Sequence, residues 1–534
     1  MKRFFLLVFV VVPSLALAQS NYAVLTGTVT DPQQRPMLGA AVQLKATATG
    51  ATRRVLTNGQ GLFEVSGLLP GDYSITTQAE GFAPAADSLH LEVGQQLTIS
   101  VRLRVGSVNE TVEVGAPVEV LRTRDASVGE VIEPQSIREL PLNGRMLIDL
   151  VLTVPGSHLS HGAQTGDMNP LYWRPGQRSA VSIAGSRPNG NYFLLDGATN
   201  TDPTFNTVNL SPSPDAVQEF KVQTGSYSAE MGGAGGGQVN IVTRSGSNQF
   251  HGTVYEFLRN GMMDATSFAS MGNNHLVQNN FGASFGGPIV HSKTFFFVNY
   301  EGFRHAMADP VIDTVPEPME IMGDFSMSGK DIYNPFSAHA NPNYDPAKPV
   351  SPSNPQIIRD QFPGNVIPQN MINSAAQLFL EKYVPKPNTG MAMGGAAVGC
   401  GMTMMGSPTV LGAGTDCNNY LDQRNELHSN NQGTLRIDHT FARGDSLSGR
   451  YSVSSENGFM PQNLPGFGAY HDNFSQHGSI AWTRVVSPRM VNIASITASR
   501  LVMRRNQENA NINDIVGELG IQGIGFGGPG AWGA

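Results

Sequence analysis

Apolar and polar side chains alternate along most of this chain, and the alternation changes character near residue 249. In residues 22–103, short β-rich runs are separated by Gly, Pro, Asn and Asp turn signals. Alternation is clear in residues 73–77 and again in residues 97–103. This pattern predicts a β-sandwich in which one face of each sheet is buried.

Residues 119–248 mix helical and extended patterns, which predicts a small α+β unit. Helices are expected from Pro134, which suits a first helical turn, and over residues 146–152. Two turn signals, Asn189-Gly190 and Asp196-Gly197, each separate runs that are typical of strands. A glycine-dense hinge then leads to the next part of the chain.

Beyond residue 249 the alternating runs approach the ~9–11 residues with which a strand crosses a bilayer. In residues 446–453, serines and Arg450 alternate with larger or apolar residues. Burying Arg436, Asp438 and Arg450 in an apolar core would be costly. Facing a wet lumen they would cost little, while the other face meets lipid. A soluble sheet with one solvated face would show the same alternation, but the strand lengths and an export signal favour a barrel, with at most seven membrane strands.

A long insertion rich in Pro, Asn and Met covers residues 305–430. Its one regular element is predicted to be a helix in Asn373–Tyr383. Because outer-membrane barrels have short periplasmic turns and long extracellular loops, we expect this insertion to be extracellular.

The N-terminus has the three parts of a secretory signal, which we assign to residues 1–18. Lys2 and Arg3 precede an apolar run, Phe4–Val12, and Ala16-Leu17-Ala18 provides a small-residue cleavage site. No later stretch is uniformly apolar over 18 residues, which excludes helical membrane spans from the prediction.

Composition narrows the function classes. Charged residues make up only 14% of the chain and the net charge is -8, which argues against nucleic-acid binding. The two cysteines, Cys400 and Cys417, lie in a loop-like region of an exported protein, so a disulfide between them is expected.

No catalytic constellation is found, and an enzyme is not expected. Gly282–Gly286 matches G-x-S-x-G, but its alternation continues where the motif needs a strand-to-helix turn. Gly525–Gly530 matches G-x-G-x-x-G, but Pro529 leaves no helix to hold a pyrophosphate. No cofactor or metal site is therefore assigned. Soft sulfur ligands that could capture Cu(I) are present near Cys400, with a flexible loop as the simpler interpretation: Met391, Met393, Met402, Met404 and Met405.

Two resemblances to known families add to this interpretation. The pattern GTVTDPQQRPMLGAAV … TNGQGLFEVSGLLPGDYSITTQAEGF resembles the carboxypeptidase regulatory-like domain. This is the transthyretin-like sandwich, without the zinc-binding catalytic domain of the peptidases. The resemblance implies either a structural spacer or a domain that contacts carbohydrate.

The chain after this domain resembles the TonB-dependent receptors, and most closely their Oar-like branch. The resemblance is carried by SIAGSRPNGNYFLLDG, DAVQEFKVQTGSYSAEMGGAGGGQVNIVTRSGSNQFHGTVYEFLRN, FGASFGGPIV, KTFFFVNYEGFR and FPGNVIPQNMINSAAQLFLEKYVPKPN. It implies a plug inside a 22-stranded barrel of the outer membrane, energised by the TonB complex of the inner membrane. Seven strands cannot enclose a plug, so we expect the chain to be the N-terminal portion of a longer receptor that does not transport alone.

The expected fold class is therefore mainly β: an N-terminal β-sandwich, a small α+β plug and an incomplete outer-membrane antiparallel β-barrel. The expected segments are a signal peptide (1–18), the sandwich (19–105), a linker (106–118), the plug (119–248) and the partial barrel (249–534) with its extracellular loop (305–430).

The expected function is uptake of a bound ligand, namely a siderophore, an oligosaccharide or a peptide, across the outer membrane of a Gram-negative-type bacterium. The resemblance implies a TonB box before the plug, for which the candidate is Glu110, Thr111, Val112, Glu113 and Val114. Candidate ligand contacts are Arg187, Asn189, Asn191 and Asp196, for which turn formation is an equal alternative. The alternative function is a cell-surface carbohydrate-binding or adhesion protein without active uptake.

Overall fold

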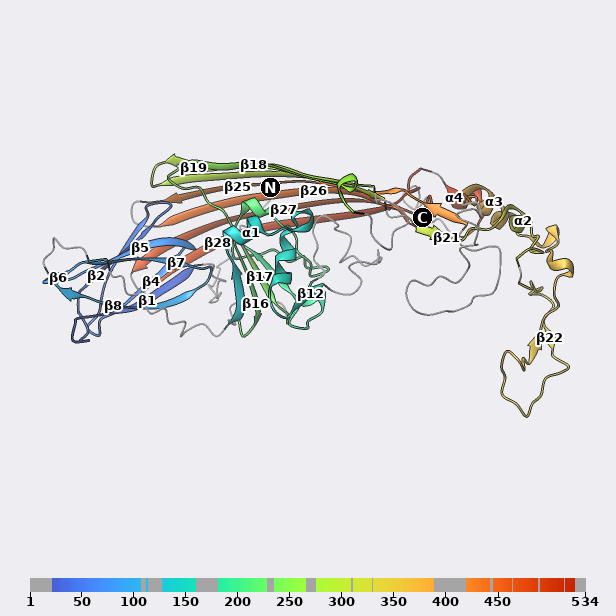
Figure 1. The fold of residues 1–534 in the computed structure, drawn as a ribbon, viewed down its shortest axis with the longest axis horizontal. Helices are drawn as coiled ribbons and strands as arrows, with labels where there is room; N and C mark the ends of the chain where they lie inside the picture. Colours follow the sequence, from blue (N-terminus) through green and yellow to red (C-terminus); the bar gives the residue numbers. More distant parts are fainter. Residues whose placement is uncertain are drawn as a thin grey trace, which may run out of the picture.

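The computed structural model shows three bodies in chain order: a β-sandwich, a small mixed unit and a curved sheet (Figure 1). It describes residues 22–106, 112–113, 127–159, 181–227, 235–265, 275–308, 311–328, 330–388, 419–441, 445–462, 464–487, 490–512 and 514–523. No helix within these ranges is long and apolar enough to cross a membrane. The predicted signal segment, residues 1–18, lies outside the described residues.

The N-terminal body is the sandwich that the alternation predicts. Its first sheet has the order β4 (Leu62–Leu68), β1 (Ala23–Thr30), β8 (Gln96–Arg102). The second has the order β10 (Val112–Glu113), β7 (Ala85–Leu91), β5 (Gly71–Gln78), β2 (Ala41–Ala46), β3 (Thr52–Leu56). A short ladder joins β6 (Phe82–Ala83) to β9 (Arg104–Val105). The inward positions of 73–77 and 97–103 are buried in one core between the sheets.

The second body, which we call the plug, is built on one five-stranded sheet. Its order is β11 (Val128–Ile132), β16 (Val217–Gly225), β17 (Gln238–Thr243), β14 (Tyr192–Leu195), β15 (Ala198–Thr199). Helix α1 (Pro134–Glu139) begins at the predicted proline. The second predicted helix is a 3₁₀ helix, η2 (Leu147–Thr153). Both contribute apolar side chains to the plug core, which also includes Phe193 and Phe220.

The two turn signals in the plug behave differently. Asp196 and Gly197, both at positive φ, join β14 to β15 in a tight hairpin, as the pattern predicts. The Asn189-Gly190 signal does not join a hairpin. Strand β13 (Val181–Ile183) pairs with β12 (Ser157–Leu159), whereas β14 pairs with β17. The reason is that β14 is apolar and fully buried at 193–195, so it is covered on both faces inside the sheet.

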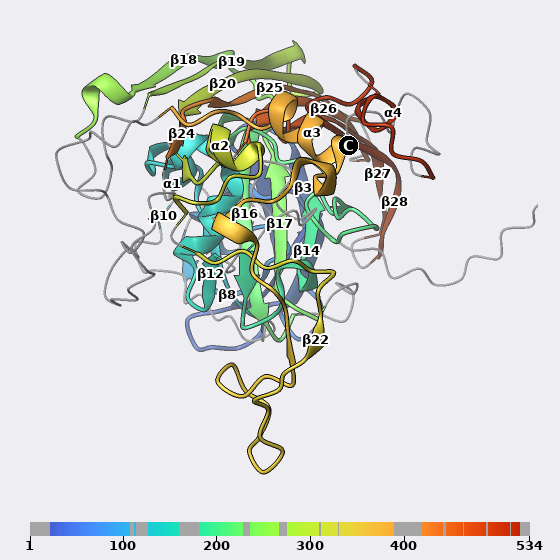
Figure 2. The same ribbon diagram turned by 90° about the vertical axis from the view of Figure 1, so that its right-hand side faces the viewer.

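The third body is a seven-stranded antiparallel sheet, which we call the wall. Its order follows the chain: β18 (His251–Asn260), β19 (Leu276–Val290), β20 (Thr294–Ala308), β25 (Asn425–Thr440), β26 (Ser446–Met460), β27 (Ala469–Ser487), β28 (Met490–Gln507). Viewed from the end, it arches over the plug without closing (Figure 2). Both the predicted hairpin at residues 290–293 and the number of strands agree with the pattern.

Burial in the wall has the polarity of a membrane barrel. On β26, Arg450 and Ser452 are 6% and 0% exposed, whereas Leu447 and Tyr451 are 38% and 46% exposed. The polar positions thus face inward and the apolar positions face outward. One expectation was wrong in detail. Arg436, Asp438 and Arg450 do not face a wet lumen, because the plug fills the space and pairs with them.

The strands of the wall reach further into the long insertion than expected. His305 pairs with His428 and Ala308 with Asn425, so both ends of the 305–430 segment belong to β20 and β25. On β25 this extension, residues 425–430, is mostly polar, and for that reason it lacks the apolar signal that marks the rest of the strand. The predicted helix is present as α3 (Ser374–Tyr383), capped by Asn373.

The short turns and the sandwich lie at one end of the wall, and the insertion lies at the other. Figure 1 shows the sandwich near the β19–β20 turn, with α2 (Pro318–Ile321), α3 and β22 (His339–Ala340) at the far end. Asn248, just before the wall, donates to the Thr49 carbonyl of the sandwich (2.7 Å) and accepts from the Ser292 amide of that turn (2.7 Å). At the same end, Thr483 of β27 donates to the Tyr22 hydroxyl (2.7 Å).

Candidate functional site at the plug–wall interface

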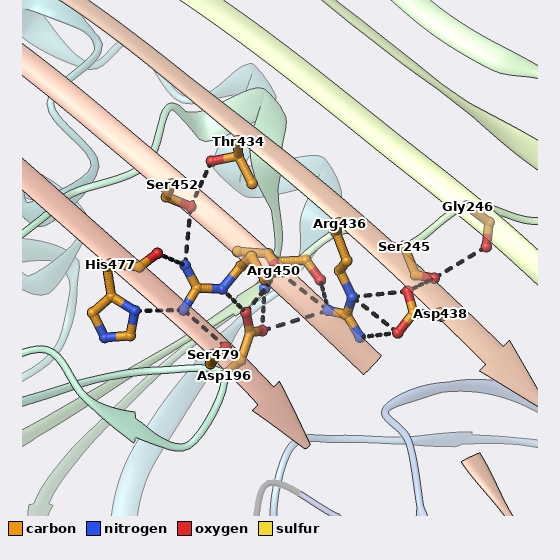
Figure 3. Close-up of polar contacts among 11 residues, drawn as sticks. Asp196, Ser245, Gly246, Thr434, Arg436, Asp438, Arg450, Ser452, His477 and Ser479 are labelled. Carbon is orange, nitrogen blue, oxygen red and sulfur yellow. Dashed lines mark hydrogen bonds and ion pairs between the residues drawn. The ribbon is translucent and has the colours of Figure 1, made fainter. Parts of the chain in front are cut away.

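The contact between plug and wall is polar and charged, and it concentrates in two clusters. The first, which we call the Asp196 cluster, joins the β14–β15 turn to β25 and β26 (Figure 3). Asp196 Oδ2 lies 2.6 Å from Arg450 Nε, and its Oδ1 lies 3.5 Å from Arg436 Nη1. The carboxylate also accepts from the amide and the hydroxyl of Thr243, each at 2.8 Å.

The register of the wall explains why an acidic side chain is needed here. Arg436 and Arg450 are direct partners across β25 and β26. Two like charges at such a position repel each other, and both arginines are buried. Asp196 supplies the negative charge that lies between them. Burial alone would raise the pKa of Asp196, but Arg450 and Arg436 lower this pKa below its ordinary value, so the carboxylate stays ionised.

Further hydrogen bonds hold each arginine in place on the wall. Arg436 forms an ion pair with Asp438 (2.9 Å), whose other contact is the hydroxyl of Ser245 at the end of the plug (2.7 Å). Arg450 Nη1 donates to the Ser452 hydroxyl (2.9 Å), and its Nη2 lies 2.8 Å from Nδ1 of His477. Charged pairs that are buried need such supporting contacts.

The second cluster, the Arg145 cluster, lies between the plug and β18 and β20. Arg145 pairs with Asp215 of the plug, and its Nε lies 3.3 Å from Glu301 Oε2 of the wall. Tyr255 donates to the same carboxylate oxygen (2.7 Å), and Gln432 donates to the other (3.0 Å). The Arg145 guanidinium also lies 4.6 Å from the ring centroid of Tyr255, within cation–π range.

Neutral hydrogen bonds continue this interface between the clusters. Ser213 of the plug donates to Asn299 of the wall (3.0 Å), and Asn280 of the wall donates to the Gly144 carbonyl (3.2 Å). The apolar core of the plug, in contrast, is made of plug residues alone. The plug is therefore a separately packed body that is attached to the wall by exchangeable polar contacts.

A third contact joins the sandwich to the plug. Glu219 of β16 accepts from the Val93 amide (2.8 Å), and Lys221 donates to the Val93 carbonyl (3.1 Å). His90 of β7 lies 2.8 Å from Asp72 and 3.6 Å from Glu219. Pairing with Glu219, supported by Asp72, raises the pKa of His90 to about 9 although burial opposes the change.

The four candidate ligand contacts do not form one group. Arg187 and Asn189 are exposed on the turn before β14. Asn191 is fully buried, where its amide donates to the Val181 carbonyl (2.6 Å) and accepts from the Gly237 amide (3.2 Å). Asp196 belongs to the plug–wall interface. The geometry thus gives Asn191 and Asp196 internal partners and leaves the other two side chains open.

The remaining candidates are only partly described. Of the five-residue TonB-box candidate, Val112 and Glu113 form β10, which runs parallel to β7 of the sandwich. Glu110, Thr111 and Val114 lie outside the described residues, as do Cys400, Cys417 and the five methionines near them. Within the described part of the chain, no group of three His, Cys, Asp or Glu side chains is placed to hold a metal ion.

Arg145, Asp215 and Glu301 were missed at the level of sequence. A signal was present for Glu301, the single acid at an inward position of the aromatic run KTFFFVNYEGFR. Nothing in the sequence indicates that Arg145, which follows a turn, reaches this site.

Comparisons with known proteins agree with this architecture. Residues 242–534 match the family model described as outer membrane beta barrel domain, and residues 24–104 match the carboxypeptidase regulatory-like domain. The chain is 33% identical over 302 residues to the TonB-dependent transporter Oar of Myxococcus xanthus, covering 54% of this chain and 27% of the relative.

Two further likenesses are more distant. A probable TonB-dependent siderophore receptor, PirA of Acinetobacter baumannii, is 26% identical over 215 residues, covering 38% of this chain and 26% of the relative. The solved structure of the outer membrane transporter YddB from Escherichia coli covers 71% of this chain and 40% of its own, with a TM-score of 0.41 and 10% identity. The chain spans about a quarter of the length of the two curated relatives, Oar and PirA.

Proposed function

We propose that this chain, which belongs to the outer membrane beta barrel domain family and is a protein of the outer membrane, is part of a TonB-dependent receptor that takes up a bound ligand past its plug. The single observation that carries this proposal is the plug–wall interface. A separately packed body lies under the wall and is attached to it through the Asp196 and Arg145 clusters. The curated relatives, a transporter and a receptor by name, support the same function.

The chemistry of the interface suits a plug that moves. Apolar side chains exposed by a displaced plug would have no substitute for their lost contacts. Ionic and hydrogen-bonding groups, in contrast, can exchange protein partners for water, so their net contribution is only about 0.5–3 kcal/mol each. The plug is thus held firmly at rest by many contacts, but each contact can be replaced as water enters.

Energy from the inner membrane would enter through the segment before the plug. Val112 and Glu113 already adopt an extended, sheet-pairing conformation. TonB would pair with this segment as an added strand, in which main-chain hydrogen bonds give the affinity. Pulling on the segment would then act on β11, which follows it in the chain and is hydrogen-bonded to β16 in the plug sheet.

The placement of the sandwich argues against adhesion at the cell surface. The short connections from β19 to β20 and from β25 to β26 mark the periplasmic end of a barrel, and the long insertion marks the extracellular end. The sandwich contacts the short-turn end. A sandwich in the periplasm cannot hold a glycan outside the cell, so transport is favoured over surface binding.

The proposal is tested by replacing Glu110–Val114 with a Gly-Ser segment of equal length in the intact receptor. Uptake of the ligand should be lost, whereas binding of the ligand to cells should remain, because the segment lies far from the insertion. A Gly-Ser replacement of the exposed sandwich turn Gln33–Pro36, which also lies far from the insertion, serves as control for the effect of the change itself. Uptake that persists without the segment would refute the proposal.

The ligand could be a siderophore, an oligosaccharide or a peptide, and screening these three classes for uptake would identify it.

A further inference from the structure

We propose that strand β7 of the sandwich holds the Val112–Glu113 segment in a paired state that competes with TonB. The inference rests on the proposed function and adds a regulatory role for the sandwich. Its basis is the place of β7 in the fold: one end of this strand binds the segment, and the other end is bound by the plug.

The first end of β7 provides the pairing edge. Val112 lies opposite Ala85 and Glu113 lies opposite Ala86, in parallel orientation. On its other side β7 is paired with β5 from Thr77 to Gly71. Without the segment, β7 would be the edge of its sheet, with main-chain groups open to an added strand. The segment is therefore bound through the same main-chain chemistry that an added TonB strand would use.

The second end of β7 is fixed to the plug. Val93, two residues beyond the strand, has its amide bound by Glu219 and its carbonyl bound by Lys221. Both side chains come from β16 and are buried, at 1% and 8% exposure. His90, within β7, lies between Asp72 and Glu219. The strand that holds the segment is thus held against the plug sheet itself.

The pairing of the segment with β7 implies a competition. A segment that is paired with β7 is not free to pair with TonB in the same way, so the apparent affinity for TonB falls with the fraction of receptor in which the segment is released. Only two residues of the segment pair with β7 in the described part of the chain. The holding contact is therefore short, and a partner that forms a longer ladder can displace it.

A disulfide across this ladder tests the proposal. In the intact receptor, Ala85→Cys with Val112→Cys should cross-link under mild oxidation, because the two residues are direct partners. A matched control combines Val112→Cys with Leu56→Cys on β3, at the opposite edge of the same sheet, and should not cross-link. The single-cysteine variants control for pairing with Cys400 or Cys417.

Binding of a purified TonB periplasmic domain is then measured before and after reduction. We expect the cross-linked receptor to bind about tenfold more weakly or worse, with full recovery on reduction. Failure to cross-link, or cross-linking with unchanged TonB binding, would overturn the role of β7 and leave the proposed function standing. Absence of TonB binding in the reduced and wild-type receptors would instead refute the proposed function, and this inference with it.

A second variant separates the contribution of β7 from that of the plug. Glu219→Gln with Lys221→Met removes the charges that bind Val93. The Ala85–Val112 disulfide should still form in this background at an unchanged rate, since β7 itself provides the pairing edge. A rate that falls about tenfold would show that the plug positions the segment, and β7 would lose its assigned role.

Discussion

Arg436 and Arg450 are the residues on which the position of the plug depends most directly. They oppose each other on the inner face of the wall, and Asp196 of the plug lies between them. Removing one member of a buried charged set leaves the others uncompensated, which is more costly than the net worth of the pair itself.

Asp196→Asn should therefore destabilise the folded protein by about 3 kcal/mol, because an amide keeps the shape but not the charge. Urea unfolding in detergent would measure the change. Asp360→Asn, at an exposed position of the insertion, removes the same charge and should have an effect below about 0.5 kcal/mol. Equal effects of the two substitutions would contradict the role of Asp196 as counter-charge.

His90 makes the sandwich–plug contact dependent on pH. Its pKa is raised to about 9 by Glu219 and Asp72, so the contact favours the protonated form. The resulting stabilisation is fully present below the ordinary pKa of histidine, near 6.5, and is lost as the pH rises through 9. The acids that face this ring are Asp72 and Glu219.

Amide exchange at Val93 should report this dependence. Protection of the Val93 amide in the wild type, corrected for intrinsic exchange, should fall between pH 7 and pH 10. In His90→Gln it should be lower at pH 7 and should change little over the range. A wild-type profile that is flat up to pH 10 would show that the charge of His90 does not support the contact.

At the scale of single residues, the sequence predicts partners poorly. The inward positions of Arg436 and Arg450 follow from alternation, because polarity is a local property. Their pairing with Asp196 depends on how the plug is placed under the wall, which no local pattern encodes. Asp196 was predicted as a turn former and as a ligand contact, and the structure shows a turn residue at positive φ whose carboxylate is directed to the wall.

At the scale of elements, the strands of the wall behave as predicted, and β27 provides a direct test of their polarity. Ile480 and Tyr470 lie on the outward face of this strand, 59% and 50% exposed. Tyr470 is close to the start of the strand at the insertion end, whereas Ile480 lies well within it. An arginine on the lipid face costs about 2–4 kcal/mol near the midplane but about 0–1 kcal/mol near the interfaces.

Ile480→Arg should accordingly reduce the folding free energy in liposomes by about 2–4 kcal/mol, and Tyr470→Arg on the same face by about 1 kcal/mol or less. Folding titrations with urea in the presence of lipid vesicles would compare the two. If both variants fold as the wild type does, the outward face of β27 does not meet hydrocarbon.

The elements that sequence predicts well are those with a strong local signal. Alternation locates the sandwich strands and the seven wall strands, and Pro134 and Asn373 locate two helices. The hairpin predicted at Asn189-Gly190 was wrong, because a turn signal does not determine which strands the flanking residues pair with. That choice is made by burial of β14 between β15 and β17.

At the scale of the whole molecule, the sandwich and the insertion occupy opposite ends of the wall (Figure 1). This polarity predicts which parts an external probe can reach. An epitope tag inserted after Gln33, in an exposed turn of the sandwich, should be labelled only after the outer membrane is permeabilised. A tag inserted after Asn343, in the exposed arm of the insertion, should be labelled on intact cells.

Antibody labelling of cells with and without permeabilisation would measure this difference. Surface labelling of the sandwich tag on intact cells would reverse the assigned orientation and would favour a surface-binding function.

The overall order of bodies was predictable from sequence, since each has its own composition. The contacts between the bodies could not be predicted from sequence. Val93 of the sandwich, for example, meets Glu219 and Lys221 of the plug only after both bodies have folded.

The facing guanidinium groups of β25 and β26 also bear on how such a protein is made. Until the plug arrives, the nascent wall carries two adjacent positive charges, and Asp438 pairs with one of them, Arg436. If the wall folded without the plug, the two arginines would either bind small anions or continue to repel each other. We therefore expect the plug to act as an internal scaffold during biogenesis, so that the two bodies reach the membrane as a jointly assembled unit.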